Sequence, residues 1–195
     1  MQQLVEPLTH PSLSPLVDVF NTIGKEFDID PCLLAAIAEE ESTWNKLAVS
    51  FDGNYGRGLM QIDAGFHPFA DQGVVYVEPV QWVNGGGRSG KAVDVAASVK
   101  NGALVFDAHS NLRYACSNLL APAFAHFAGR ADCDVCVIAS YNAGVAGVDA
   151  ALAQGRTPES ATFDPSYVAK ITASHAWLLK TSAANGSAVH ADSVA

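Results

Sequence analysis

The chain has 195 residues, of which 49% are hydrophobic and 16% charged, and its 20 acidic residues outnumber 11 Lys and Arg to give a net charge of −9. This length is typical of a protein built around one core, and the apolar fraction excludes a wholly disordered chain. No apolar run approaches the roughly 20 residues of a membrane span, and the scattered basic residues argue against a nucleic-acid partner. We expect a monomeric globular protein with no membrane span.

Two helices are predicted near the start of the chain. Apolar residues recur at helical spacing from Pro15 to Phe27. Asp30-Pro31 is typical of an N-cap followed by a proline in the first turn, so a second helix is expected from there to about Trp44.

Glycines punctuate the next segment, residues 50–90, and predict loops with a small hairpin, in which Val74-Val75-Tyr76-Val77 is strand-like. Helical periodicity then returns, with helices expected at residues 93–109, 112–128, 133–141, 145–152 and 165–179. Residues 182–195 are small and polar, which predicts a flexible tail after a single domain at 1–181. The fold class is therefore mainly α, with a small irregular or β insertion placed to form one wall of a cleft.

A carboxylate stands out in the second predicted helix. On a wheel of about 100° per residue, Glu41 falls within the stripe of Leu34, Ile37 and Trp44, whereas Glu39 falls on the opposite face. Burial of a carboxyl on an apolar face raises its pKa, which suits a general acid. Two alternatives remain: Glu41 lies near the helix end, where the apolar stripe has already reached the surface, or it simply pairs with an arginine.

Further carboxylates follow in the glycine-rich segment. Asp63 closes the run Gly56-Arg57-Gly58-Leu59-Met60-Gln61-Ile62-Asp63, and Asp52 lies in the same segment. One acid on a helix and a second carboxylate on a loop is the arrangement that glycoside hydrolysis requires. Alternatively, Asp52 belongs to a turn and Asp63 caps a loop.

Other motifs carry weaker signals. The four cysteines, Cys32, Cys116, Cys133 and Cys136, are compatible with two disulfides or with buried thiols, and no second metal-ligand pair accompanies Cys133 and Cys136. Residues 85–92 nearly match a nucleotide-binding loop, but Ala92 replaces the hydroxyl that ligates magnesium, so a surface loop is favoured. No metal or cofactor is expected.

Three short motifs in order resemble glycoside hydrolase family 23, which contains the goose-type lysozymes and the soluble lytic transglycosylases. They are Glu41-Ser42, Gly58-Leu59-Met60-Gln61-Ile62-Asp63 and Ala139-Ser140-Tyr141-Asn142-Ala143-Gly144. Residues 99–103 and 166–171 are similar to the start of an intervening helix and to the final helix of that family. The resemblance covers roughly residues 28–180 and implies a lysozyme-like fold of the goose type.

The resemblance also implies roles. Glu41 corresponds to the general acid, and Asp63, or else Asp52, to the residue that activates water in an inverting hydrolysis. Asp52, Asp63 and His67 stand where the goose-type lysozymes have an aspartate pair and a histidine, whereas lytic transglycosylases lack the aspartates and form 1,6-anhydro products. In the family, the other matching positions line the sugar cleft or hold the catalytic glutamate in place. In this sequence they are Ser42, Met60, Gln61, His67, Tyr141, Asn142 and Tyr167. Tyr141 and Tyr167 are expected to hydrogen-bond Glu41.

The resemblance implies cleavage of the β-1,4 bond between N-acetylmuramic acid and N-acetylglucosamine in peptidoglycan. Its alternatives are a lytic transglycosylase, a chitinase of the same family, and a lysozyme-like module that binds glycan without cutting it. The acidic chain, with a pI near 4.9, lacks the positive charge that lysozymes commonly present to an anionic wall and would suit neutral chitin. No signal peptide is visible, so a secreted or periplasmic location implies a mature form or phage delivery, and an intracellular protein remains an alternative.

Overall fold

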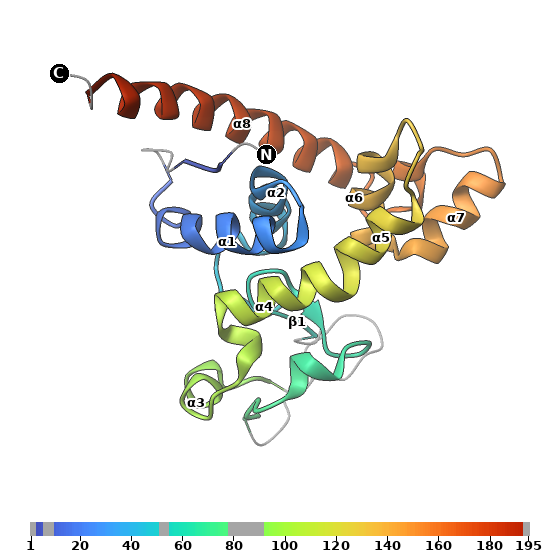
Figure 1. Cartoon of the computed structure of the whole chain (residues 1–195). Helices are drawn as coiled ribbons and strands as arrows, with labels where there is room; N and C mark the ends of the chain where they lie inside the picture. Colours follow the sequence, from blue (N-terminus) through green and yellow to red (C-terminus); the bar gives the residue numbers. More distant parts are fainter. Residues whose placement is uncertain (1–2, 6–9, 51–54, 78–91, 193–195) are drawn as a thin grey trace. The chain divides into compact units, whose positions relative to one another are not determined.

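The computed structural model describes residues 3–5, 10–50, 55–77 and 92–192, with side chains described to residue 184. Asp52 and residues 85–91 of the nucleotide-loop-like stretch lie outside these ranges. Helices dominate, and two short strands form a small sheet (Figure 1). The mainly α class with a small β insertion is confirmed.

The first two helices follow the sequence signals closely. A short 3-10 turn, η1 (Ser14–Leu16), leads into α1 (Val17–Phe27), which ends where Asp28 adopts a left-handed φ of 54°. Asp30 accepts a hydrogen bond from the backbone N–H of Cys32 at 3.0 Å, and α2 (Pro31–Ser42) starts there. Every residue of α2 from 31 to 38 is buried, so this helix has no solvent face over two thirds of its length.

The insertion contains an antiparallel pair, β1 (Gly56–Arg57) and β2 (Ile62–Asp63), followed by the 3-10 turn η2 (Pro68–Asp71). The predicted hairpin is therefore present, but the strand-like piece at 74–77 contributes only an isolated bridge between Tyr76 and Val93.

The long helix predicted at residues 93–109 is wrong. The segment divides into α3 (Val95–Lys100), the 3-10 turn η3 (Leu104–Phe106) and the beginning of α4 (Ala108–Ala115). Gly102 breaks the helix with a φ of 77°, and Asp107 starts α4 by accepting from the Ser110 N–H at 2.8 Å. Residues 99–103, which resemble a helix start, thus close α3 instead.

Helical structure then continues through a π-helical turn, η4 (Cys116–Leu120), into α5 (Ala121–His126). The next two helices, α6 (Cys133–Ala143) and α7 (Val145–Ala153), match the predicted ones and meet at Gly144. After the 3-10 turn η5 (Pro158–Ala161), the last helix, α8 (Tyr167–Asp192), runs beyond the predicted end. Ser182 is buried and accepts from the Val5 N–H at 3.0 Å, which explains why the expected tail begins as packed helix.

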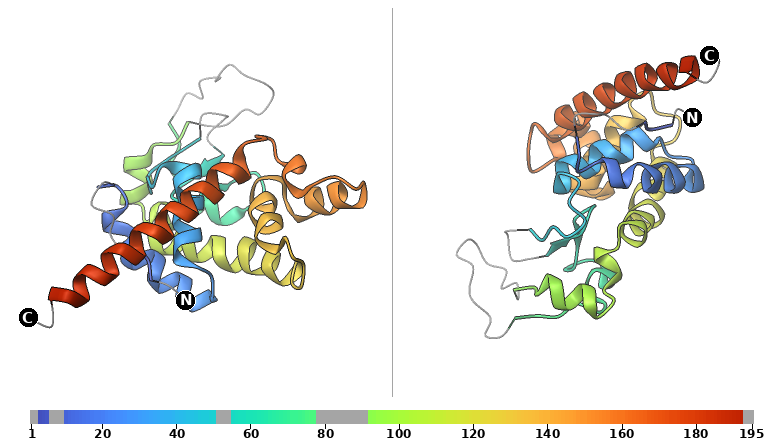
Figure 2. Two further views of the ribbon diagram at one scale, coloured as in Figure 1. Left: turned by 90° about the horizontal axis from the view of Figure 1, so that it is seen from above. Right: turned by 90° about the vertical axis from the view of Figure 1, so that its left-hand side faces the viewer.

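The chain divides into two compact units. The helical unit comprises residues 1–40 and 114–195, and the insertion unit comprises residues 41–113. In the helical unit, α6 contacts α5, α7, η5 and α8, and α8 passes α2 (Figure 2). In the insertion unit, η2 packs on η3, and α3 packs on η3 as well. The single domain predicted for residues 1–181 stays a prediction.

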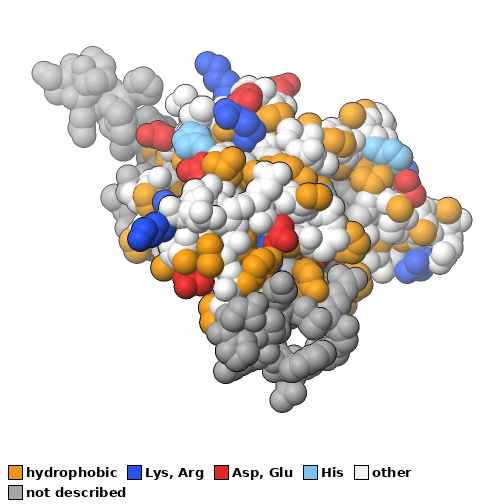
Figure 3. Space-filling model, turned by 90° about the horizontal axis from the view of Figure 1, so that it is seen from below, with side chains coloured by type: hydrophobic (Ala, Val, Ile, Leu, Met, Phe, Trp, Pro, Cys, Tyr) orange, Lys and Arg blue, Asp and Glu red, His pale blue; other side chains and the backbone are white. Residues whose placement is uncertain are grey.

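The structure also bears on the membrane-protein and nucleic-acid-binding classes that the composition argued against. Within the described ranges, no single helix has the length and apolar character of a membrane span, and α6 and α7 pass such a test only as a pair bent by 120°. On the face drawn in Figure 3, Lys and Arg side chains lie scattered among acidic and apolar ones.

Candidate active site

Glu41 and Ser42 form the last turn of α2. The helix stops because Thr43 and Trp44 both adopt positive φ values, 53° and 57°, which are costly for residues other than glycine. Trp44 is buried and anchors this turn. The Ser42 hydroxyl donates to the Leu59 carbonyl at 2.7 Å, so the half-buried Glu41 lies one residue before a direct link to the glycine-rich loop.

The loop at residues 58–61 is a tight turn that requires its glycine. Gly58 has a φ of 76°, and a Cβ at this position would lie 2.1 Å from the Val105 carbonyl and 2.4 Å from Nδ2 of Asn111. Gln61 closes the turn with a φ of 46°, and its Nε2 donates to the Gly58 carbonyl at 2.9 Å. The side chain of Met60 is fully buried beneath the turn.

Asn111 secures this loop from α4, and the sequence analysis did not identify it. Its Oδ1 accepts from the Met60 N–H at 2.8 Å, and its Nδ2 donates to the carbonyls of Arg57 at 3.1 Å and Val105 at 2.9 Å. The side chain is completely buried. Its partners Met60 and Arg57 are more than fifty residues away in sequence, at separations of 51 and 54, so no local pattern points to its role.

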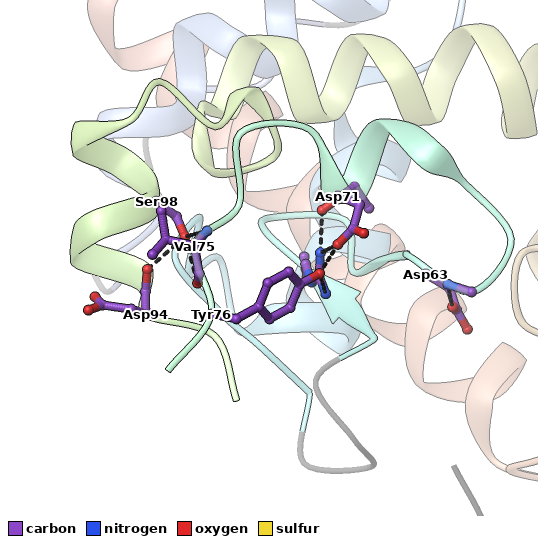
Figure 4. A network of polar contacts seen from close by, with 9 residues as sticks. Asp63, Asp71, Val75, Tyr76, Asp94 and Ser98 are labelled. Atoms are coloured by element: carbon purple, nitrogen blue, oxygen red, sulfur yellow. Dashed lines mark hydrogen bonds and ion pairs between the residues drawn. The ribbon is translucent and has the colours of Figure 1, made fainter. Parts of the chain in front are cut away.

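Arg57, at the end of β1, bonds to Asp71 and Tyr76, which Figure 4 labels. Only 3% of Arg57 is exposed, and its guanidinium donates to the Ala70 carbonyl and to Asp71, each at 2.6 Å, and to the Tyr76 hydroxyl at 3.0 Å. The Tyr76 hydroxyl also bonds to Asp71. A buried charge is tolerated when it is paired and hydrogen-bonded, and here it clamps β1 to η2.

Asp63 ends β2 and lies apart from the Arg57 cluster in Figure 4. Its Oδ1 accepts from the Gly65 N–H at 2.6 Å, and its carbonyl accepts from the His67 N–H at 2.9 Å. Asp63 therefore does cap a turn, which was the structural alternative considered from sequence. This use of Oδ1 does not occupy Oδ2, so the role of Asp63 as a base stays a prediction, as does that of Asp52.

The other predicted site residues belong to the helical unit. Tyr141 and Asn142 lie in the last turn of α6, which ends at Gly144 with a φ of 72°. Tyr167 is buried at the first position of α8. Asn142 accepts through Oδ1 from the Phe163 N–H at 2.8 Å. The predicted hydrogen bonds from the two tyrosines to Glu41 stay predictions.

The two glutamates before Glu41 have structural partners on α8. Glu39 accepts from the Ser174 hydroxyl, and Glu40 accepts from the Lys170 ammonium at 2.8 Å. Lys170 also reaches Asp164 at 2.8 Å, and its hydrogen bond to this carboxylate lowers the pKa of Asp164 below its usual range. Glu39, on the wheel face opposite the apolar stripe, is therefore turned toward α8.

The four cysteines are free thiols in the structure. Burial raises the pKa of Cys32 to about 11 and that of Cys116 to about 12, so both stay protonated at neutral pH. Burial also raises the pKa of Cys133 and of Cys136. Among the described residues, no group of three or more His, Cys, Asp or Glu is arranged to hold a metal ion.

A pocket of about 500 Å³ lies in the helical unit, and none of the predicted site residues lines it. Its wall includes Leu33 near the start of α2, residues 130–135 and Ile138 at and after the start of α6, and Thr172 and His175 of α8. This pocket is thus at the beginnings of α2 and α6, whereas Glu41 and Asn142 lie at their ends.

Comparison with known proteins links the anchored loop to one family. The model of the transglycosylase SLT domain, a member of the lysozyme-like superfamily, matches residues 18–66. The matched segment includes Glu41, Ser42, Gln61 and Asp63, and it ends before His67. No curated protein matches the chain.

Proposed function

We propose that this protein cleaves the β-1,4 bond between N-acetylmuramic acid and N-acetylglucosamine in peptidoglycan, with Glu41 as the general acid. One observation carries the proposal: the segment that matches the transglycosylase SLT domain contains both Glu41-Ser42 and the loop that the Ser42 hydroxyl ties to it. A carboxyl held at a helix end beside a rigid loop suits proton donation to a leaving oxygen.

In the reaction we favour, Glu41 donates its proton to the glycosidic oxygen while the bond from that oxygen to the anomeric carbon breaks. The 6-hydroxyl of the same muramic acid residue attacks the anomeric carbon, and its proton passes to the Glu41 carboxylate. The product is a 1,6-anhydro sugar, no water is consumed, and the acid is regenerated. The match to the transglycosylase SLT domain at residues 18–66 supports this reaction.

Hydrolysis is the second candidate, and Asp63 is the observation in its favour. Oδ2 of Asp63 makes no hydrogen bond among the described residues, while Oδ1 holds the turn. A carboxylate oriented in this way could accept a proton from an attacking water. The acidic net charge of −9 keeps neutral chitin as an alternative substrate for either reaction.

The test is mass spectrometry of soluble fragments released from purified peptidoglycan, with chitin oligomers as the second substrate. Anhydro ends, lighter by one water, support transglycosylation, and hydrated reducing ends support hydrolysis. Glu41→Gln should abolish turnover and retain glycan binding, whereas Glu39→Gln, on the same helix, should cleave normally because the amide can still accept from Ser174. Retained turnover in Glu41→Gln would remove the proposal.

A wall-degrading activity needs access to the wall. We therefore include in the proposal a secreted or periplasmic location, and a monomer that acts on a polysaccharide without metal or cofactor.

A further inference from the structure

Phe163 is the most exposed large apolar side chain in the described part of the protein, with 88% of its surface accessible. An aromatic ring in water gains none of the free energy that burial provides. Single exposed apolar residues are nevertheless common on protein surfaces. The exposure of Phe163 therefore indicates a binding role only if the surrounding backbone fixes the position of the ring.

The backbone around Phe163 is fixed by hydrogen bonds on both sides. Its N–H donates to Oδ1 of Asn142 at 2.8 Å. The Thr162 hydroxyl donates to the carbonyls of Glu159 and Asp164, each at 2.7 Å. The ring is thus displayed by a well-ordered turn, which limits the entropy lost if a ligand covers it.

The same hydrogen bond orients Asn142. A backbone N–H can only donate, so the atom it meets is the amide oxygen, and Nδ2 with its two donors points elsewhere. Nδ2 has no hydrogen-bond partner among the described residues, and it is not one of their buried unpaired atoms, so water can reach it. One hydrogen bond therefore joins an exposed aromatic ring to an accessible pair of donors.

This combination matches the chemistry of an N-acetylated sugar. A pyranose presents an apolar C–H face, which packs on an aromatic ring, and oxygen atoms at its edge, which accept hydrogen bonds. The residues on either side of Phe163 in the chain, Thr162 and Asp164, are polar, so the ring does not belong to an apolar run of sequence.

The turn is also connected to the end of α2. Asp164 follows Phe163 directly, and Lys170 bridges Asp164 to Glu40, with both contacts at 2.8 Å. Glu40 is the residue before Glu41 in the chain. The turn that displays Phe163 is therefore tied through Lys170 to the α2 segment of the helical unit, which ends at Glu40.

We propose that Phe163 is a glycan-binding residue, on which a sugar ring stacks while Nδ2 of Asn142 donates to one of its oxygens. The inference rests on the proposed function and names a sugar contact that neither the motifs nor the matched segment at 18–66 includes.

The test compares wild type with Phe163→Ala and Phe163→Trp, and uses Leu104→Ala in η3 as the control, since Leu104 is also an exposed apolar residue, at 51%. The KM is measured on soluble uncrosslinked glycan strands, and affinity by calorimetric titration with a soluble β-1,4-linked N-acetylglucosamine oligomer. Phe163→Ala should raise KM and the dissociation constant about five- to tenfold, the effect of losing part of the burial of one ring, and leave kcat within about twofold.

Phe163→Trp should bind at least as tightly as wild type, and its additional emission should change on titration. An unchanged KM and affinity in Phe163→Ala, with the same unfolding midpoint as wild type, would overturn the inference while cleavage by wild type still upheld the proposed function. If wild type binds the oligomer and cleaves neither substrate, the proposed function fails and the titration alone decides the role of Phe163.

Discussion

Replacing Asn111 with alanine tests whether one buried amide fixes the loop beside Glu41. The substitution leaves the Met60 N–H without its acceptor and removes a donor from the Arg57 and Val105 carbonyls. A buried unpaired group costs about 1–3 kcal/mol, and a carbonyl suffers less than an N–H because it has two lone pairs. We expect Asn111→Ala to lower the free energy of unfolding by about 3–5 kcal/mol, a large share of the roughly 5–15 kcal/mol typical of a domain.

The assay is urea unfolding followed by the emission of Trp44, which is 4% exposed and belongs to the same insertion unit. The midpoint should fall while the slope of free energy against urea stays constant. Asn101→Ala is the matched control, because the Asn101 amide makes one exposed hydrogen bond, to the Gly73 carbonyl at 3.0 Å. A loss below about 1 kcal/mol for Asn111→Ala, or one equal to that of the control, would refute the reasoning.

Asn111→Asp separates the three hydrogen bonds. A carboxylate can still accept from the Met60 N–H, but its second oxygen would face the carbonyls of Arg57 and Val105 and repel them. The variant should therefore be at least as unstable as Asn111→Ala at neutral pH. Acid should partly restore it, because a protonated carboxyl can donate to one carbonyl.

Three further predictions follow from the geometry. Gly58→Ala should destabilise the protein by at least about 2 kcal/mol in urea unfolding because its Cβ meets backbone, whereas Gly102→Ala, with a similar φ and nothing within 4 Å, should cost only the backbone strain of about 1 kcal/mol. Lys170→Met should raise the pKa of Asp164 toward its usual range, measured by NMR titration, because the hydrogen bond from Lys170 is the main cause of its lowering. Burial raises the pKa of Asp30, but hydrogen bonds from His175 and from the Cys32 N–H outweigh burial, so the pKa is lowered overall. The Asp30 carboxylate therefore stabilises the fold above about pH 4, and this contribution is lost as the pH falls through the lowered pKa. Asp30→Asn should make the unfolding free energy decline less steeply with acid over that pH range.

Local signals were sufficient for much of the helical unit. Asp30-Pro31 marked the start of α2 because the capping carboxylate and the proline both act within one turn. The helices predicted at 133–141 and 145–152 match α6 and α7, and Gly144 lies between the two with a φ of 72°, which glycine adopts at little cost. Gly102, by contrast, was passed over within a helical period, although its φ of 77° is what ends α3.

The wheel argument for Glu41 rested on an assumption that the fold does not meet. A wheel separates faces only when one side of the helix is solvated, and α2 is buried on every side from Pro31 to Ala38. Glu39, on the wheel face opposite the apolar stripe, bonds to Ser174 of α8. The wheel therefore singles out Glu41 on a premise that the fold does not support, and the order of the three motifs is the sequence signal for Glu41 that does not depend on that premise.

The contacts of the loop at residues 58–61 explain why its short motif tolerates few substitutions. The Ser42 hydroxyl donates to the carbonyl of Leu59, which is 17 residues away in sequence. Asn111 accepts from the N–H of the following residue, Met60. Gly58 must be a glycine for that approach to exist, since a Cβ would overlap the Val105 carbonyl. The Glu-Ser pair and the glycine-rich motif are thus two parts of one hydrogen-bonded unit that is in place before any ligand arrives. For Glu41 as the proposed proton donor, a helix end fixed in this way lowers the cost of placing its carboxyl at the leaving oxygen when the substrate binds.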